Sequence, residues 1–405
     1  MTTFPAVGID DVVAAAGVLD GTILRTPLLE SRALSELAGG PVFLKCENLQ
    51  RTGSFKVRGA FLRIARLSDA ERARGVVAAS AGNHAQGVAL AATALNTKST
   101  VVMPRGATLP KVAATRSYGA QVVLHGLTVE DALARARELA EEDGAIFIHP
   151  FDHPDVIVGQ GTVGLEITEQ CPQVRTIAVP VGGGGLAAGT AIAAKARIPG
   201  VRVIGVQAEA VAAVPASLKA GHPVTVHGGP TMADGIAVAR PGELTFAVLA
   251  ELADEVVTVS EENLSRGLLL SLERAKQLVE PAGVAGVAAL LEHSPLFEPP
   301  AVIILSGGNI DPLLLAKVLR HGLAAAGRYL AFRCRLTDRP GALATLLGEL
   351  AGLGANVLDV VHARVTADLR VDEAEVLLQV EARGPEHCDS VISQLRKAGY
   401  TVLFS

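Results

Sequence analysis

The chain has little excess of charge of either sign. Its 36 lysines and arginines and 41 aspartates and glutamates give a formal net charge of −5, and the basic residues are scattered rather than clustered. A protein that binds DNA, RNA or acidic lipid needs a basic patch or stripe. The composition therefore gives no indication of a nucleic-acid or membrane-surface partner.

Cysteine is scarce, and the spacing of the cysteines is not that of a metal site. The four cysteines, Cys46, Cys171, Cys334 and Cys388, lie far apart and include no C-x-x-C pair. This distribution argues against a zinc site and against a disulfide framework. It is typical of a protein from a reducing cytosol.

Two kinds of membrane signal are missing. The N-terminal stretch MTTFPAVGIDDVV lacks the basic segment and following apolar segment of a secretory signal peptide. The longest uncharged run, residues 176–194, contains Pro180 and four consecutive glycines, a pattern typical of a strand, a loop and a helix. We expect a soluble, cytoplasmic protein without membrane association.

What the chain does have is length and apolar content. Its 405 residues, 49% hydrophobic and 19% charged, suffice for two or three domains with large cores and exclude a disordered chain. From about residue 40 to 325, short β-branched runs alternate with alanine-rich helical patterns, which indicates a mainly parallel sheet covered on both faces. The number of units predicts an α/β domain over residues 1–325 with two lobes and a cleft, the smaller lobe spanning roughly 50–150.

The expected strands and helices of this region can be named from the sequence. The strands are predicted at 75–80, 99–104, 120–125, 145–149, 175–181, 201–207, 255–260 and 301–306, with helices at 83–95 and near 110–118.

The pattern changes after residue 325. Strands are predicted at 328–336, 355–365, 373–382 and 401–404, with helices at 339–354 and 387–400. The order β-α-β-β-α-β within about 80 residues is that of a ferredoxin-like unit. We therefore expect a separate α+β domain over residues 326–405.

Four consecutive glycines, 182–185, follow one predicted strand and precede a predicted helix. Backbone N–H groups without a nearby Cβ, at a helix N-terminus, can surround a phosphate. The same residues fit a loose dinucleotide fingerprint, with Gly182, Gly184 and Ala187 in the motif and Glu209 as a ribose-binding acid. No Gly-Lys-Ser/Thr follows, which excludes a P-loop, but the motif alone does not separate the other two possibilities.

Lys56 follows a Thr-Gly-Ser turn in TGSFKVRGA. Most lysines are solvated surface charges, but an amine in an apolar or cationic setting loses its proton more readily and can act as a nucleophile. Here Ser54 could cap a helix, Phe55 offers apolar cover and Arg58 offers positive charge. The spacing alone leaves both interpretations open.

Two further loops follow predicted strands. In SAGNHAQG, residues 80–87, Asn83 suits either a ligand's carboxylate or hydroxyl or a helix N-cap, and His84 suits either a general base or a structural role. In SGGNID, residues 306–311, the glycine-rich turn carries one hydroxyl, and Asn309 or Asp311 could cap the next helix.

Taken together, TGSFKVRGA, SAGNHAQG, GGGGL and SGGN resemble the fold type II family of pyridoxal-phosphate enzymes, and within it the threonine dehydratases, also called threonine ammonia-lyases. The resemblance spans roughly residues 5–325 and implies pyridoxal 5'-phosphate as cofactor. It implies Lys56 as the Schiff-base lysine, Asn83 at the ring hydroxyl and Ser306 at the ring nitrogen. The implied cofactor-binding residues are Phe55, Lys56, Asn83, Gly182, Gly183, Gly184, Gly185, Leu186 and Ser306. The implied substrate-binding residues are Ser80, Ala81, Gly82, Asn83 and His84.

The resemblance implies β-elimination and deamination of L-threonine to 2-oxobutanoate and ammonia, with L-serine giving pyruvate as a side activity. Lys56 would remove the Cα proton, and we expect nearby positive charge to lower the pKa of its ammonium. A serine at the ring nitrogen would make a weaker electron sink than an aspartate does, which suits prompt loss of the β-hydroxyl.

A serine or threonine racemase of the same fold is the main alternative. Racemases of this fold carry a serine, the base on the second face of the substrate, where this chain has Ala81. Glu209 matches one metal-binding residue of the racemases, but the following AVAAVPAS offers no aspartate, so we expect no metal site. A nicotinamide-dependent oxidoreductase, based on the glycine run alone, and a binding protein that has lost catalysis are further alternatives.

The C-terminal unit resembles an ACT domain, through DRPGALATLL (338–347) and GANVLDVVHAR (354–364). The resemblance implies allosteric regulation by an amino acid, isoleucine or valine, as in isoleucine biosynthesis, or a module that only mediates assembly. It also implies a homodimer or homotetramer. The implied effector-binding residues are Asp338, Arg339, Pro340, Gly341, Ala342 and Asn356.

Overall fold

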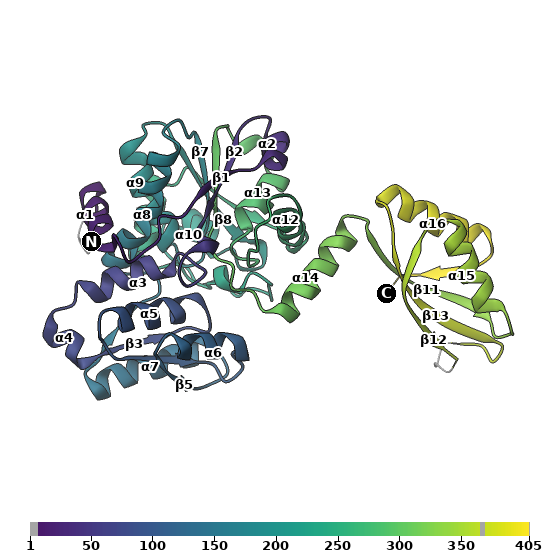
Figure 1. Cartoon of the computed structure of the whole chain (residues 1–405), viewed down its shortest axis with the longest axis horizontal. Helices are drawn as coiled ribbons and strands as arrows, with labels where there is room; N and C mark the ends of the chain where they lie inside the picture. The colour runs from purple at the N-terminus through teal and green to yellow at the C-terminus, as the bar shows by residue number, and fades with distance from the viewer. Residues whose placement is uncertain (1–6, 365–368, 405) are drawn as a thin grey trace. The chain divides into compact units, whose positions relative to one another are not determined.

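The computed structural model describes residues 7–364 and 369–404 and divides the chain into two compact units (Figure 1). Residues 1–6, the start of the N-terminal stretch discussed above, lie outside the description, as does Val365, the last residue of a predicted strand. The units are Met1–Pro312 and Leu313–Ser405. The division falls at the beginning of helix α14 (Pro312–Ala325) rather than at its end, where the sequence analysis placed it.

The larger lobe of the first unit is built on a six-stranded sheet in the order β1-β2-β10-β7-β8-β9. Only β1 is antiparallel to its neighbour, and the other pairs are parallel. The strands are β1 (Leu28–Glu30), β2 (Val42–Cys46), β7 (Thr176–Pro180), β8 (Arg202–Ala208), β9 (Glu255–Val259) and β10 (Ala301–Leu305).

Helices cover both faces of this sheet, as parallel strands require. One face is covered by α9 (Gly185–Arg197), with α8 (Pro154–Gln170) and α1 (Ile9–Leu19) packed behind it. The other face is covered by α13 (Ala285–Glu292), against which α12 (Glu261–Arg274) packs (Figure 1). All residues of β7 and β10 are buried, which explains why their sequences are apolar apart from Thr176.

The smaller lobe has a four-stranded parallel sheet in the order β5-β4-β3-β6. Its strands are β3 (Val76–Ala79), β4 (Ser99–Met103), β5 (Gln121–Leu124) and β6 (Ile146–Phe147). Helices α5 (Asn83–Ala94) and α6 (Leu109–Ser117) pack on one face, and α7 (Val129–Asp143) packs on the other. The predicted strands and the helices at 83–95 and 110–118 thus form the sheet and the helices that were expected.

Helix α3 (Lys56–Ala65) links the two lobes and packs against both α5 and α8. Its approach to α8 depends on two glycines. A Cβ on Gly59 would lie 2.8 Å from the carbonyl oxygen of Val156, and a Cβ on Gly159 would lie 2.7 Å from the Cα of Gly59. The helix that begins with Lys56 is therefore held against the large lobe at backbone distance.

The second unit contains an antiparallel sheet in the order β12-β13-β11-β14. Its strands are β11 (Tyr329–Thr337), β12 (Asn356–Ala363), β13 (Glu373–Glu381) and β14 (Thr401–Leu403), with helices α15 (Ala342–Gly352) and α16 (Pro385–Lys397). One face of the sheet and both helices share a core that includes Phe332, Leu346 and Leu395. This arrangement is the predicted ferredoxin-like one.

None of the helices within residues 7–364 and 369–404 combines the length and apolar character that crossing a membrane requires.

Candidate active site

Lys56 is the first residue of α3, and its side chain is half-buried. Its Nζ donates to the carbonyl oxygen of Pro150 at 3.1 Å and lies 5.2 Å from the centroid of the Phe55 ring. Burial lowers the pKa of Lys56 to about 8, partly opposed by the carboxylate of Glu280. A lysine in this setting is a neutral amine for part of the time near neutral pH.

The expectation that nearby positive charge lowers the pKa of Lys56 is wrong. Arg58, the cation expected to do so, is itself neutralised, because its guanidinium lies 2.8 Å from Glu47 and 2.6 Å from Glu166. Burial of the amine is the main cause of the shift.

The loop before Lys56 is joined to the loop after β10 by backbone hydrogen bonds. The N–H of Phe55 donates to the carbonyl of Ser306 at 3.2 Å, and the N–H of Gly308 donates to the carbonyl of Gly53 at 2.9 Å. Gly53 has φ +71°, and a Cβ there would lie 2.5 Å from Asn309 Oδ1. The buried Ser306 is thereby placed directly beside the lysine loop.

Asn83 is the first residue of α5, with Gly82 at the N-cap position. Its amide donates to Glu280 Oε1 at 2.6 Å and accepts from Asn309 Nδ2 at 2.8 Å. Asn83 is therefore not the helix cap that the sequence left possible. Asn309, a possible cap for the next helix, instead uses its amide to bind Asn83 and the carbonyl of Thr52.

Ser54, suggested as a cap of the helix at Lys56, does not act as one. The N-cap position is occupied by Phe55, without a side-chain cap. The Ser54 hydroxyl is buried, and within the described part of the chain it has no hydrogen-bond partner.

The glycine run connects β7 to the N-terminus of α9. Gly184 occupies the N-cap position with φ +100°, and a Cβ there would lie 2.8 Å from that of Thr245. A Cβ on Gly183 would lie 2.3 Å from the ring of Phe151. The first turn of α9 leaves its N–H groups without intrahelical partners, so this close-fitting cradle suits a phosphate.

The segment 149–152 connects the lysine to the glycine run, because Pro150 binds Lys56 and Phe151 covers Gly183. His149 orders this segment through Nδ1, which accepts from the N–H of Asp152 at 2.8 Å, and its ring lies edge-on to Phe151. Burial lowers the pKa of His149 to about 4. Sequence reasoning missed this segment, although the run HPFDHP places several ligand-capable side chains directly after a predicted strand.

The Asp152 carboxylate fastens the segment at its other end. It accepts from the backbone N–H groups of Glu243, Leu244 and Thr245, at the N-terminus of helix α11 (Glu243–Leu252). A carboxylate in this position also interacts favourably with the helix dipole.

The loop from Ser80 to His84 lies at the start of α5. The Ser80 hydroxyl accepts from the N–H of Gly82 at 3.1 Å, and the buried His84 donates from Nε2 to the carbonyl of Ile148 at 3.0 Å. Burial lowers the pKa of His84 to about 3. His84 is therefore a neutral structural histidine with its proton on Nε2, and its imidazole is not poised as a base.

One ion pair crosses from the small lobe to the large lobe close to this loop. Lys111 on α6 lies 2.9 Å from Asp234 in the short helix η3 (Asp234–Ile236), and its Nζ would be 3.9 Å from a Cβ on Gly82. Neither residue was singled out from the sequence.

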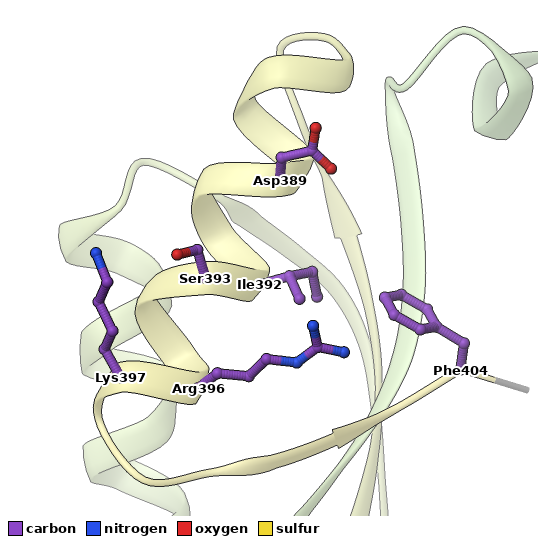
Figure 2. Close-up of a pocket in the computed structure, with 6 residues that line it drawn as sticks. All are labelled: Asp389, Ile392, Ser393, Arg396, Lys397 and Phe404. Carbon is purple, nitrogen blue, oxygen red and sulfur yellow. The ribbon is translucent and has the colours of Figure 1, made fainter.

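In the second unit, two of the predicted effector residues make surface hydrogen bonds through their side chains. Asp338 accepts from Arg364 Nε at 3.2 Å, and Asn356 donates to Glu381 at 3.3 Å. Gly341 is the N-cap of α15, with φ +89°. A hollow of about 510 Å³ lies elsewhere in this unit, beside α16 (Figure 2). It is lined by Asp389, Ile392, Ser393, Arg396, Lys397 and Phe404.

Residues 19–307 match the model of a family described as "pyridoxal-phosphate dependent enzyme". The chain therefore belongs to the pyridoxal-phosphate dependent enzymes, and its cofactor is pyridoxal phosphate. This family match contradicts the alternative of a nicotinamide-dependent oxidoreductase, which rested on the glycine run alone.

Individual relatives agree with this family. The chain is 47% identical to an L-threonine ammonia-lyase of Thermotoga maritima, over 97% of this chain and 98% of that protein. A threonine deaminase structure from Solanum lycopersicum matches with a TM-score of 0.73 at 39% identity, covering 77% of this chain and 91% of that one. The structure of maize serine racemase matches with a TM-score of 0.74 at 35% identity, covering 79% and 99%.

Proposed function

We propose that the protein catalyses the dehydration and deamination of L-threonine to 2-oxobutanoate and ammonia, with L-serine to pyruvate as a side reaction. The observation that carries this proposal is the linkage of the four loops around Lys56. The Lys56 loop is hydrogen-bonded to the loop after β10, Asn309 of that loop binds Asn83, and Pro150 and Phe151 connect Lys56 to the glycine run. The close similarity to a threonine ammonia-lyase over nearly the whole chain supports the choice of substrate.

Lys56 has two roles in this proposal. Its amine anchors the coenzyme covalently, and once displaced by the substrate amine it removes the Cα proton at Nζ. Bound pyridoxal phosphate supplies the electron sink that makes this proton acidic. With a pKa of about 8, roughly a tenth of the Lys56 amine is unprotonated at pH 7, far more than for an exposed lysine.

The remaining site residues bind and orient. We assign the coenzyme phosphate to the backbone N–H groups of Gly182–Leu186, the ring hydroxyl to the Asn83 amide and the ring nitrogen to the Ser306 hydroxyl. Phe55 packs beside the Lys56 amine, and the loop from Ser80 to His84 receives the substrate carboxylate. The fit of the cradle is supported by Gly183 and Gly184, where any Cβ would collide with Phe151 or Thr245.

Ala81 distinguishes elimination from racemisation. Racemisation requires a second proton-transfer group on the face of Cα opposite Lys56. Ala81 lies in the loop assigned to the substrate and carries no exchangeable proton. The likeness to maize serine racemase therefore reflects the shared fold, and racemisation remains the alternative to be tested.

We further propose that the unit Leu313–Ser405 is an ACT regulatory domain that binds isoleucine or valine. Its ferredoxin-like topology supports this assignment. The N-terminus of α15, with Gly341 as N-cap, offers backbone donors for an amino-acid carboxylate. A homodimer or homotetramer, a cytoplasmic location, a role in isoleucine biosynthesis and the absence of a metal remain predictions.

The decisive experiment measures products and colour together. Purified protein supplied with pyridoxal phosphate should be yellow, and borohydride should bleach it. It should form 2-oxobutanoate from L-threonine with a higher kcat/KM than pyruvate from L-serine, by a factor set by one methyl group, about 10- to 200-fold at most. A colourless protein, or D-serine as the main product from L-serine, would contradict the proposal.

A further inference from the structure

A series of hydrogen bonds runs through Asn83, and its direction is fixed at one end. The Asn309 amide lies 2.6 Å from the carbonyl oxygen of Thr52, which only accepts, so the facing atom of Asn309 is its nitrogen. The same Nδ2 lies 2.8 Å from the Asn83 amide and has a second hydrogen to give. The facing atom of Asn83 must therefore be its oxygen, which settles the orientation of an amide that is otherwise ambiguous.

The other end of the Asn83 amide meets Glu280. Asn83 Nδ2 lies 2.6 Å from Glu280 Oε1, and the Glu280 side chain is buried. Burial raises the pKa of Glu280 to about 7, with the charge of Asp234 adding to the shift and the charges of Lys111 and Lys56 opposing it. In either protonation state, one carboxyl oxygen can accept from Asn83, which leaves the second hydrogen of Nδ2 unused.

Gly307 shows how tightly this arrangement is built. The N–H of Glu280 donates to the carbonyl of Gly307 at 2.9 Å. A Cβ on Gly307 would lie 2.4 Å from Glu280 Oε1 and 3.1 Å from Asn83 Nδ2. The second glycine of the SGGN loop therefore makes room for the Glu280–Asn83 contact.

We propose that Glu280 and Asn309 are positioning residues that hold the Asn83 amide in one orientation, so that one of its N–H groups is available to the ring hydroxyl of the coenzyme. This inference rests on the proposed role of Asn83. Neither residue needs to touch the reacting atoms, because each acts through Asn83.

The test compares variants by two properties of the coenzyme complex. The first is the Kd for pyridoxal phosphate. The second is the ratio of visible to near-ultraviolet absorption, which reports the position of the proton near the ring hydroxyl. Glu280→Gln keeps an accepting oxygen and should stay within about twofold of wild type. Glu280→Leu removes the group that accepts from Asn83 Nδ2. Asn309→Asp replaces the donating amide nitrogen by a carboxylate oxygen, which would face the Thr52 carbonyl oxygen and Asn83 Oδ1. Each should raise the Kd about tenfold or more and lower the ratio.

The Asn83→Ala variant separates the two levels of the argument. If Asn83→Ala lowers the ratio but Asn309→Asp and Glu280→Leu leave it unchanged, the inference about positioning is overturned and the proposed site stands. If Asn83→Ala has no effect on either property, the proposed role of Asn83 fails. A fall in the ratio for Glu280→Gln equal to that for Glu280→Leu would also overturn the inference. Asn309→Asp is nearly isosteric, so it provides the test even if Glu280→Leu does not fold.

Discussion

The amine of Lys56 combines burial with a hydrogen bond to a carbonyl rather than to a carboxylate. A carboxylate at that place would favour the ammonium form and raise the pKa, whereas the Pro150 carbonyl accepts a hydrogen bond without supplying a full charge. The result is a pKa of about 8, near the working range of a general base.

Replacing Lys56 by alanine should remove both the coenzyme anchor and the base. We expect Lys56→Ala to lower ammonia release from L-threonine by about 10³-fold or more and to abolish coenzyme attachment by borohydride. The measurements are ammonia release and the mass of the reduced protein. Lys98→Ala, at an exposed lysine, is the control and should match wild type. Substantial turnover by Lys56→Ala would show that another group is the base.

The glycine cradle should not tolerate a single methyl group at Gly183. A Cβ there would lie 2.3 Å from the Phe151 ring, so Gly183→Ala must displace the ring or the loop, at about 1–3 kcal/mol. We expect coenzyme affinity to fall by roughly tenfold or more, measured by titration of the visible absorption. Gly17→Ala in α1 meets no atom within 4 Å and should leave the affinity unchanged. Equal affinities for the two variants would contradict the assigned cradle.

His84 should make stability depend on acidity. Its pKa is about 3 in the folded protein and about 6.5 when unfolded, so the unfolded chain binds an extra proton as pH falls below about 6.5. The free energy of unfolding should then fall by about 1.4 kcal/mol per pH unit from this residue alone. Urea unfolding at several pH values would measure the slope.

The matched variants for this measurement are both histidine-to-glutamine changes. His84→Gln can keep the bond to the Ile148 carbonyl while removing the titration. The slope of its unfolding free energy against pH should therefore be smaller by about 1.4 kcal/mol per pH unit, the contribution of one proton. His222→Gln, at an exposed position, should keep the wild-type slope. A His84→Gln slope equal to that of wild type would show that His84 is protonated in the folded protein.

At the scale of the element, α3 is held in place by buried charges. Arg58 binds Glu47 through two nitrogens and also binds Glu166, while Lys45 binds Glu166 at 2.5 Å. Because Arg58 lies two residues after Lys56, this network fixes the helix turn that carries the proposed catalytic amine.

Removing the central cation should therefore cost stability. Arg58→Met removes the positive charge that pairs with the carboxylates of Glu47 and Glu166. We expect the free energy of unfolding to fall by about 3–5 kcal/mol as a result. Arg66→Met breaks a more exposed pair with Asp155 and should cost less than about 1 kcal/mol. Denaturant unfolding compares the two variants, and similar losses would contradict the central role of Arg58.

The strands and helices were largely predictable from local sequence, but their contacts were not. The short apolar runs at β3, β7 and β10 are rich in β-branched residues, which is typical of buried strands, so their pattern was sufficient to predict them. The close packing of α8 on α9 depends on glycines whose partners lie far away in sequence. A Cβ on Gly189 would lie 2.2 Å from the Ile157 carbonyl, and nothing local to Gly189 reveals this.

The same distinction applies to the site. The four loops carry recognisable motifs, so their residues could be singled out from the sequence. Glu280 lies in VEPAGVAG, which has no such motif, and its contact with Asn83 spans 197 residues. The cause of the Lys56 pKa shift was also inaccessible, because the sequence shows the neighbouring Arg58 but neither the burial of the amine nor the carboxylates that pair with the arginine.

At the scale of the whole molecule, the four loops of the proposed active site all lie within Met1–Pro312. The family match ends at residue 307, before the second unit begins. Catalysis and the proposed regulation are therefore expected to be separable along the chain.

A chain ending at residue 312 should test this separation. We expect it to keep the coenzyme colour and most of the threonine ammonia-lyase activity, while losing any response to isoleucine. Steady-state rates with and without isoleucine are the measurement, and Asp338→Asn in the full chain is the matched control for loss of response alone. A truncated protein that still responds to isoleucine would place the effector site in the first unit.

Helix α14 begins only three residues after Asn309, which is itself tied to both Thr52 and Asn83. The covalent path from the second unit, which begins at Leu313, to Asn309 is thus very short. A force that pulled on α14 along the chain would displace Asn309 before it displaced any strand of the first unit. Tension along α14 would in this way reach the Asn309–Asn83 hydrogen bond through the chain itself.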